Sequence, residues 1–259
     1  MRPAEGPKRD DAGALALSLH GETCRLRPSG GLWIETYQAL VVADLHLEKG
    51  SAYASRGQML PPFDTRETLR RLRAEVEALQ PERLVFLGDT FHDGNAEGRL
   101  DWRDRADLEE LATGRELVWV SGNHDPGGPA GLGGRTVDEI RLGALRLRHE
   151  PEPGLQPGEV SGHLHPCARI RSPRGTVRRR CFATDGQRMI LPAFGAYAGG
   201  LNIRDEAFAG LFREAPLLGA LGIGAVHAVG WRSSIADASS PRAEAPLQAQ
   251  WQGRRRRSP

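Results

Sequence analysis

The sequence predicts an α/β fold, and three observations lead to that prediction. Short apolar runs at 39–43, 84–87 and 116–120 have the length and composition of buried strands. A segment at 64–79 carries Leu and Val at helical spacing, so strand, helix and strand follow one another as in a βαβ unit. A cluster of polar residues follows each apolar run, at the strand ends where open α/β sheets bind ligands.

Local patterns define the other elements of this first part. The tetrad from Asp64 to Glu67 predicts a capping box, in which the Asp64 side chain caps the helix and Glu67 bonds back to it. A second helix is expected at about 101–113, where Gly114 ends it. Before the first apolar run, glycine-containing turns separate short predicted strands at 15–19, 24–27 and 32–34.

After a Gly/Pro-rich loop at 126–134, the pattern changes to short alternating pieces. Such pieces predict antiparallel strands of a second sheet, at 136–140, 144–148, 158–161, 176–184 and 187–191, with a last strand at 225–229. We expect one domain over 14–231. The flanking segments 1–13 and 232–259 are rich in polar residues, Pro and Arg, and are expected to be disordered.

Composition narrows the class of protein. The 259 residues are 39% hydrophobic and carry a formal net charge of +2, which suits a soluble domain with an adequate core. The three cysteines are scattered and form no CxxC pair, so a disulfide framework is not expected and a reducing cytoplasm fits best. No apolar run is long enough to cross a bilayer, and the polar N-terminus is not a signal peptide.

The polar clusters contain six of the eight histidines. Oxygen and imidazole donors without a thiolate favour Mn, Fe or Zn in an open catalytic site over a structural zinc. The number of strong donors exceeds what one ion needs, so two metals are implied. The clusters are Asp44-x-His46, Gly88-Asp89-x-x-His92-Asp93, Gly122-Asn123-His124-Asp125, His149-Glu150-Pro151 and Gly162-His163-x-His165.

In this order the clusters resemble the calcineurin-like metallophosphoesterase superfamily. Further matches around Lys49, Arg56-Gly57, and the stretches 149–151, 161–166 and 191–195 bring the chain closest to the ligase-associated DNA damage response endonuclease (PdeM) family. The resemblance covers roughly residues 15–230. It implies a metallophosphoesterase sandwich, with two mixed β-sheets flanked by helices and a dimetal site at the C-terminal rim of the strands.

The resemblance also implies roles for individual residues. His124 would be the general acid, Asp125 would orient its ring and raise its pKa, and His92 would donate to a ligand or line the pocket. Asp89 would bridge two divalent ions, most often Mn, with Fe or Zn as alternatives. One ion would be held by Asp44, His46, Asp89 and His165, and the other by Asp89, Asn123, His149 and His163.

The implied activity is Mn-dependent hydrolysis of phosphodiester bonds, with single-stranded or nicked DNA as substrate. The resemblance places this activity in bacterial DNA repair, alongside an ATP-dependent DNA ligase and a helicase. A small-molecule phosphomonoesterase, a cyclic-nucleotide phosphodiesterase and a nonenzymatic scaffold remain alternatives. Arg178–Arg180 could contact phosphates or form a solvated strand face, and the Arg254–Arg257 run could add affinity for nucleic acid or only solubility. The oligomeric state is left open.

Overall fold

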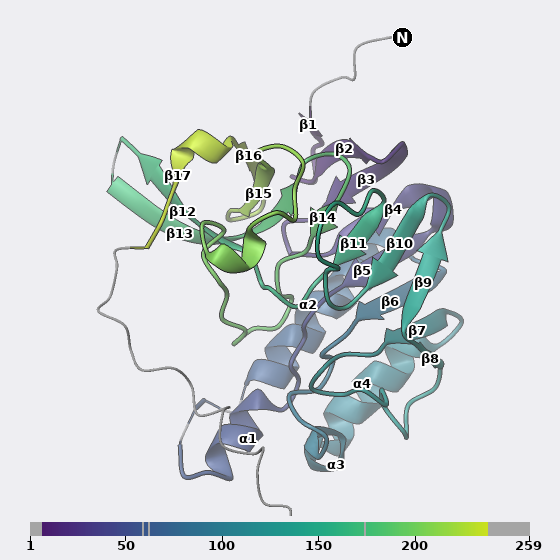
Figure 1. The fold of residues 1–259 in the computed structure, drawn as a ribbon. Coiled ribbons are helices and arrows are strands. Elements are labelled where there is room, and N and C mark those ends of the chain that lie inside the picture. The colour runs from purple at the N-terminus through teal and green to yellow at the C-terminus, as the bar shows by residue number, and fades with distance from the viewer. Residues whose placement is uncertain (1–6, 59, 62, 174, 238–259) are drawn as a thin grey trace, which may run out of the picture.

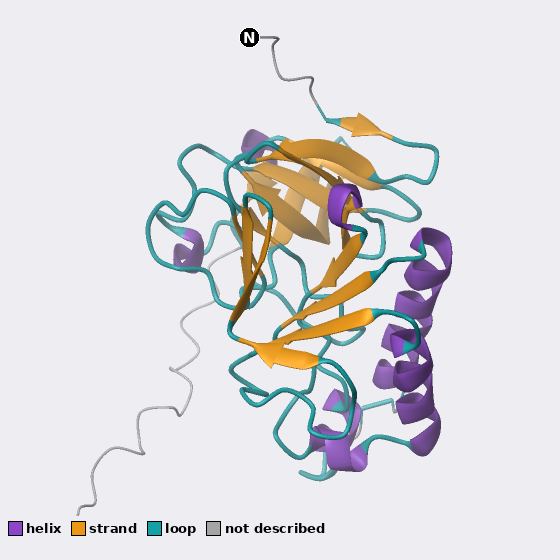
Figure 2. Ribbon diagram, turned by 90° about the vertical axis from the view of Figure 1, so that its right-hand side faces the viewer, coloured by secondary structure: helices purple, strands orange, loops and turns teal. Residues whose placement is uncertain are grey.

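The computed structural model describes residues 7–58, 60–61, 63–173 and 175–237. Two mixed β-sheets pack face to face (Figure 1), and helices α2 (Asp64–Leu79) and α4 (Trp102–Ala112) cover the outer face of the first sheet (Figure 2). This arrangement confirms the predicted α/β sandwich. Among the described residues no helix is long and apolar enough to cross a membrane.

The first sheet has eight strands in sequence order. Its first half is an antiparallel meander, whereas β5 to β8 run parallel to one another. The predicted strands at 15–19, 32–34, 39–43 and 116–120 are all present, within one residue at their ends. The strands are β1 (Lys8–Arg9), β2 (Leu15–Leu19), β3 (Glu22–Leu26), β4 (Leu32–Ile34), β5 (Ala39–Val42), β6 (Arg83–Leu87), β7 (Glu116–Val120) and β8 (Arg135–Val137).

The second sheet differs from the antiparallel arrangement that alternation predicts, because β10, β11 and β14 pair in parallel. The predicted strand at 136–140 is two strands, since the chain leaves the first sheet after Val137 and enters the second at Glu139. No strand was predicted for β12 or β15. The strands are β9 (Glu139–Leu142), β10 (Leu145–Arg148), β11 (Glu159–Ser161), β12 (Cys167–Ser172), β13 (Gly175–Thr184), β14 (Met189–Ile190), β15 (Leu217–Leu221), β16 (Val226–Val229) and β17 (Ser234–Ile235).

Structure extends further toward both termini than the sequence predicts. Strand β1 pairs with β2, and β17 pairs with β12, although both lie in segments expected to be disordered. These strands are held by backbone hydrogen bonds to an edge strand, and such bonds do not depend on the side-chain pattern from which strands are predicted. Residues 1–6 and 238–259 lie outside the described residues, and with them the Arg254–Arg257 run.

The two faces of the first sheet build two separate cores. Alternate side chains of a strand point to opposite faces, so Val41 and Val85 face the second sheet while Leu40 and Phe86 face helices α2 and α4. Trp119 stacks on Phe86 in the helix-side core, with ring centroids 4.1 Å apart. Strands β5 and β6 are therefore buried on both faces, which explains their continuous apolar runs.

The predicted capping box at α2 does not form. Asp64 is the first residue of the helix, Phe63 occupies the cap position, and no side chain caps it. The buried Asp64 carboxylate instead accepts a hydrogen bond from the backbone of Gly50, in the first turn of the short helix α1 (Lys49–Ala54). Glu67 pairs with Arg70 on the helix surface. A tertiary contact has replaced the local one, because Asp64 faces α1 rather than its own helix end.

A buried ion pair joins β11 to the β14 hairpin and to two loops. Arg188 lies 2.9 Å from Glu159, and the two side chains are 1% and 0% exposed. The Arg188 guanidinium also donates to the backbone carbonyls of Gly154 and Leu211. This residue therefore connects the strand bearing Ser161 to the loop that follows His149.

Replacing Arg188 with methionine is expected to lower the free energy of unfolding by about 3–5 kcal/mol, because it leaves the Glu159 carboxylate buried without its main partner. Urea denaturation measures the change. The control Arg141→Met removes an exposed arginine and is expected to change stability by less than about 0.5 kcal/mol. An Arg188→Met change as small as that of the control would contradict the assigned role. The double variant with Glu159→Leu is expected to recover part of the loss.

Candidate metal centre

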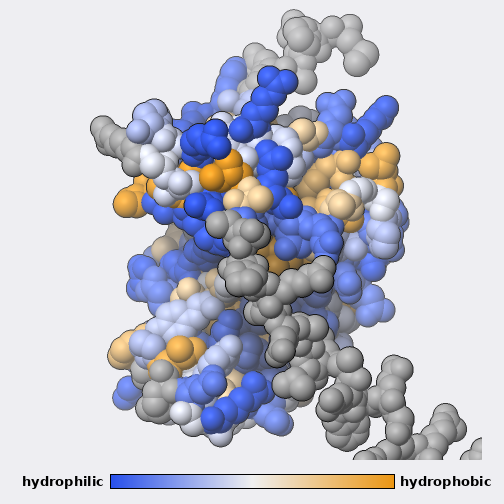
Figure 3. Space-filling model, turned by 60° about the vertical axis from the view of Figure 1, so that its left-hand side comes forward, coloured by the Kyte–Doolittle hydropathy of each residue, from blue (hydrophilic) through white to orange (hydrophobic). Residues whose placement is uncertain are grey.

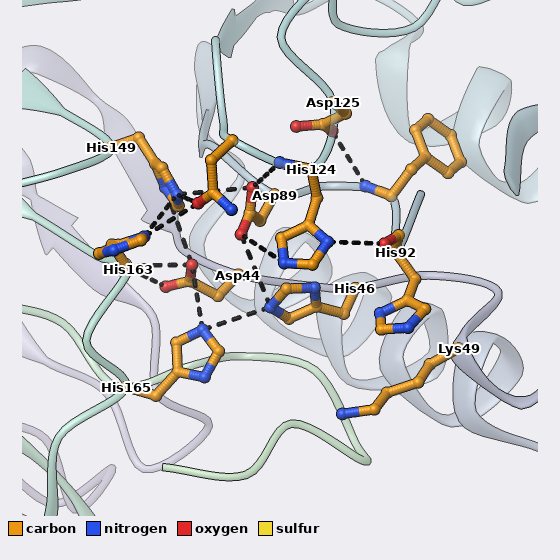
Figure 4. Close-up of polar contacts among 12 residues, drawn as sticks. Asp44, His46, Lys49, Asp89, His92, His124, Asp125, His149, His163 and His165 are labelled. Carbon is orange, nitrogen blue, oxygen red and sulfur yellow. Dashed lines mark hydrogen bonds and ion pairs between the residues drawn. The ribbon is translucent and has the colours of Figure 1, made fainter. Parts of the chain in front are cut away.

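The polar clusters converge because the strands that precede them end at one rim. Parallel strands β5, β6 and β7 lead into Asp44, Asp89 and Asn123, and strands β10 and β11 of the second sheet lead into His149 and His163. A bridge between Ala43 and Ala193 joins the ends of the two sheets. The carboxyl ends of both sets of parallel strands therefore face the same space (Figure 4).

The backbone at this rim is held in an unusual conformation. Nine described residues other than glycine have a positive φ, and five of them are predicted metal ligands. Left-handed backbone costs free energy for residues with a side chain, and it persists where the surrounding structure enforces it, as at functional sites. The five are Asp44 (φ 54°), His46 (46°), Asp89 (45°), His163 (65°) and His165 (46°).

A first group consists of Asp44, His46 and His165. One donor atom from each lies within 4.8 Å of the others. The Nε2 atom of His165 is 3.2 Å from Oδ1 of Asp44 and 3.3 Å from Nε2 of His46. Asp44 is fully buried, and its carboxylate also accepts a hydrogen bond from the backbone of His163.

A second group consists of Asp89, His149 and His163, with Asn123 beside them. The Oδ1 atom of Asn123 is 3.0 Å from both Nε2 of His149 and Nδ1 of His163. The same Nε2 atom is 3.4 Å from Oδ1 of Asp89. Four donors from four different loops thus meet at one point.

Asp89 lies between the two groups and directs one oxygen to each. Its Oδ1 faces His149 of the second group, whereas its Oδ2 is 3.9 Å from Nε2 of His46 in the first group. Burial raises the pKa of Asp89, but hydrogen bonds from His149 and from the backbone of His124 outweigh burial and hold it well below the usual range. Asp89 is therefore an anion with its oxygens divided between the two groups.

The donor set fits divalent cations. The Nδ1 atom of His149 donates to the carbonyl of Leu87, 3.1 Å away, which leaves the Nε2 lone pair directed at the carbonyl oxygen of Asn123. Burial lowers the pKa of His149, yet the hydrogen bond to Asp89 and the charge of Asp44 raise it to about 9. The site thus favours positive charge at this Nε2, and a proton or a metal cation satisfies the facing lone pairs.

In the first group, His46 is an imidazole that is suited to bind a cation. Burial lowers its pKa to about 3, so the imidazole stays neutral and keeps a lone pair for a cation. Its Nε2 faces the Nε2 of His165. Two imidazole nitrogens in this arrangement can bind one cation between them.

Two of the ligand motifs need a glycine because a carboxylate packs against its backbone. A Cβ atom at Gly122 would overlap the backbone nitrogen and carboxylate of Asp89. A Cβ atom at Gly162 would come within 2.5 Å of Oδ2 of Asp44. The glycine before each ligand cluster therefore admits a carboxylate from the neighbouring strand end.

His124 lies at the open side of the site, with Nε2 3.9 Å from Oδ2 of Asp89. Its Nδ1 donates to the backbone carbonyl of His92 at 2.8 Å. The prediction that Asp125 orients this ring is wrong. The Asp125 carboxylate points away from His124 and accepts a hydrogen bond from the backbone of Phe91 (Figure 4). Burial, together with the charge of Asp89, raises the pKa of Asp125 to about 6.

His92 lines the same space, as one of the two predicted alternatives states. Its ring stacks on His124 with centroids 5.6 Å apart and meets His46 edge-on at 5.7 Å.

The sequence predicted no role for Lys49, which is one of only two lysines in the chain. Burial lowers the pKa of His92 and the nearby charge of Lys49 lowers it further, so a cationic side chain stands at the edge of the site.

Comparison with known proteins places these features in a family. A family model described as calcineurin-like phosphoesterase matches residues 37–192. The nuclease MPE of Pseudomonas putida has a similar crystal structure, with a TM-score of 0.63 and 26% identity over 83% of this chain and 100% of that chain. Yfce, a phosphoesterase from E. coli, gives a TM-score of 0.36 and 15% identity over 74% and 98%, which is too weak to support a conclusion. No curated protein matches the chain significantly in sequence.

Proposed function

Because the chain belongs to the calcineurin-like phosphoesterase family, a family of metal-dependent phosphoesterases, we propose that it hydrolyses phosphodiester bonds of DNA with two divalent cations at this rim. The observation that carries the proposal is the position of Asp89, which directs one oxygen to each of two groups of donors. One cation is assigned to Asp44, His46, Asp89 and His165, and the other to Asp89, Asn123, His149 and His163.

When bound, such a pair of cations supplies Lewis-acid stabilisation of the phosphoryl oxygens and acidifies a water molecule. The chain's own side chains do the rest. Asp44 and Asp89 provide the negative charge that would hold two cations. Gly162 and Gly122, which have no side chain, leave room for these two carboxylates. Manganese is our first choice for the metal, since the oxygen and imidazole donors suit it, with iron or zinc as alternatives.

His124 is proposed to protonate the leaving oxygen. Its Nδ1 is occupied by the His92 carbonyl, so only Nε2 is free to carry a proton into the site. The ring is partly exposed, which allows a substrate oxygen to approach it. Because Asp125 does not contact this ring, the task of orienting it falls to the His92 backbone, and Asp125 positions the Phe91 backbone instead.

The proposed substrate is single-stranded or nicked DNA. Support comes from the similarity to the P. putida nuclease, which covers that whole chain. We further propose that the enzyme acts in bacterial DNA repair, in functional association with an ATP-dependent DNA ligase and a helicase. A cytoplasmic location is in keeping with three buried, unpaired cysteines.

The test compares two substrates with one enzyme. Cleavage of end-labelled single-stranded DNA in the presence of Mn²⁺ is measured beside hydrolysis of bis-(p-nitrophenyl) phosphate. We expect both activities, and we expect both to be lost on chelation and regained on adding Mn²⁺. Turnover of the small diester with DNA left intact would refute the DNA proposal and favour a small-molecule phosphodiesterase. Absence of both activities from protein shown to contain metal would favour a binding scaffold.

A further inference from the structure

Strands β12 and β13 form a two-stranded arm that begins at the metal centre. Strand β12 starts at Cys167, two residues after His165. The arm extends outward from the body, with β17 along the edge of β12 (Figure 1). Figure 3 views the molecule from this side, where hydrophilic side chains lie beside hydrophobic ones in the upper part.

The register of the arm places four arginines on one face. Directly opposed residues of an antiparallel pair share a face, and alternate residues of a strand return to it. Arg169 is opposite Arg178, and Arg180 and Arg171 follow two positions from them on the same face. Arg179 belongs to the other face, opposite Ala168. Three consecutive arginines in the sequence are thereby divided between two faces.

This arginine face, made of Arg169, Arg171, Arg178 and Arg180, begins beside the metal ligands. Arg180 donates to the carbonyl of Gly195 at 3.1 Å, and the Gly195 backbone in turn donates to the carbonyl of Asp44. Arg178 donates to the carbonyl of Gly200, which lies against the backbone of His165. Successive charges then lead away from the site along the strands, about 7 Å apart on each strand.

Most of the charge on this face is not neutralised within the described residues. Asp237 pairs with Arg178 at 2.7 Å, while Arg180 and Arg169 bond to carbonyl oxygens, which leave their charge in place. Arg171 is exposed and has no hydrogen bond or ion pair inside the described part of the chain. Four cations and one partner anion leave net positive charge on this face, from the largely buried Arg180 beside the metal centre to the exposed Arg171 at the outer end.

We propose that the arginine face binds the sugar-phosphate backbone of the DNA strand that enters the metal centre. The proposal rests on the proposed DNA-cleaving function and adds the surface that holds the substrate outside the rim. Guanidinium groups match phosphate oxygens in bidentate geometry, and contacts to phosphates position a strand without reading its sequence. A small phosphodiester occupies only the metal centre and does not reach this face.

The experiment measures binding of labelled single-stranded DNA by fluorescence anisotropy in EDTA, so that no cleavage occurs. The test variant is Arg169→Ala with Arg171→Ala, and the matched control is Arg179→Ala on the opposite face of the same arm. We expect about tenfold weaker binding for the double variant and nearly unchanged binding for the control. The slope of log K against log salt concentration is expected to fall by about 1.4, or 0.7 for each lost phosphate contact.

Two further measurements separate the possible failures. Hydrolysis of bis-(p-nitrophenyl) phosphate is expected to stay unchanged in the double variant, which shows that fold and metal centre are intact. Lysine at both positions is expected to restore most of the salt slope, because it keeps the charge. Equal losses in the test and control variants, or no loss in either while the wild type cleaves DNA, would overturn the arm proposal and leave the proposed function standing. A wild type that hydrolyses the small diester but neither binds DNA in EDTA nor cleaves it with Mn²⁺ would overturn both.

Discussion

Asp89→Asn is expected to reduce hydrolysis of bis-(p-nitrophenyl) phosphate by about 10³-fold or more and to lower the bound metal from two ions per chain. The change keeps the size of the side chain but removes the anion whose two oxygens face His149 and His46. Weakening both sites at once removes Lewis-acid stabilisation worth several kcal/mol, and each 1.4 kcal/mol is a factor of ten in rate. Steady-state kinetics and elemental analysis of the metal measure the two effects.

The matched control is Asp93→Asn, a carboxylate four residues further along the chain. Asp93 pairs with Arg99 at 2.9 Å and accepts a hydrogen bond from the backbone of Asn95, as expected of a turn residue. Its loss is expected to leave both metals and most of the activity in place. If Asp89→Asn retained two metals and wild-type turnover, Asp89 would not bridge the two groups and the assignment of ligands would have to be abandoned.

His124→Ala is expected to slow DNA cleavage by about 10²–10⁴-fold, the usual contribution of a general acid, while both metals stay bound. The effect on bis-(p-nitrophenyl) phosphate is expected to be much smaller, because p-nitrophenolate leaves without protonation. The free Nε2 of His124 is directed into the site, whereas its Nδ1 is held by the His92 carbonyl. Paired kinetics on the two substrates and a metal determination measure this difference.

His227→Ala controls for loss of a histidine outside the site, since His227 lies on β16 and contacts Arg9. It is expected to behave like the wild type on both substrates. Loss of metal from His124→Ala would show that His124 is a ligand, as its closeness to His46 and His92 permits. Equal slowing of both substrates would show that it does not protonate the leaving group.

The sequence determined much of the fold because buried strands and amphipathic helices leave local patterns. The apolar runs at β5, β6 and β7 are continuous because each strand is covered on both faces. Helix α4 begins at Trp102, and the side chain of Asp101 caps it. The order of the ligand clusters placed every predicted metal ligand at the ends of strands. All seven side chains do meet at one rim.

Tertiary structure decided which side chains pair. His124 and Asp125 are neighbours in the sequence, yet their side chains leave the backbone in different directions, so Asp125 bonds to Phe91 and not to the ring beside it. Asp64 has the sequence pattern of a cap for its own helix but bonds to the backbone of Gly50 in α1, because the preceding helix packs against the start of α2. The hydrogen-bond partner of each of these side chains depends on other elements of the fold, which a local sequence pattern does not reveal.

The division of Arg178, Arg179 and Arg180 between two faces shows the same limit. The sequence presents one basic run, which could be a phosphate contact or a solvated strand face. Strand alternation separates Arg179 from its two neighbours, but only the register with β12 adds Arg169 and Arg171 to the face of Arg178 and Arg180, and only tertiary contacts with Gly195 and Gly200 place that face beside the metal centre. Composition and periodicity thus determined most of the strands and the donor types of this protein. Long-range pairing decided their partners, because a hydrogen-bonded register is a property of two strands together.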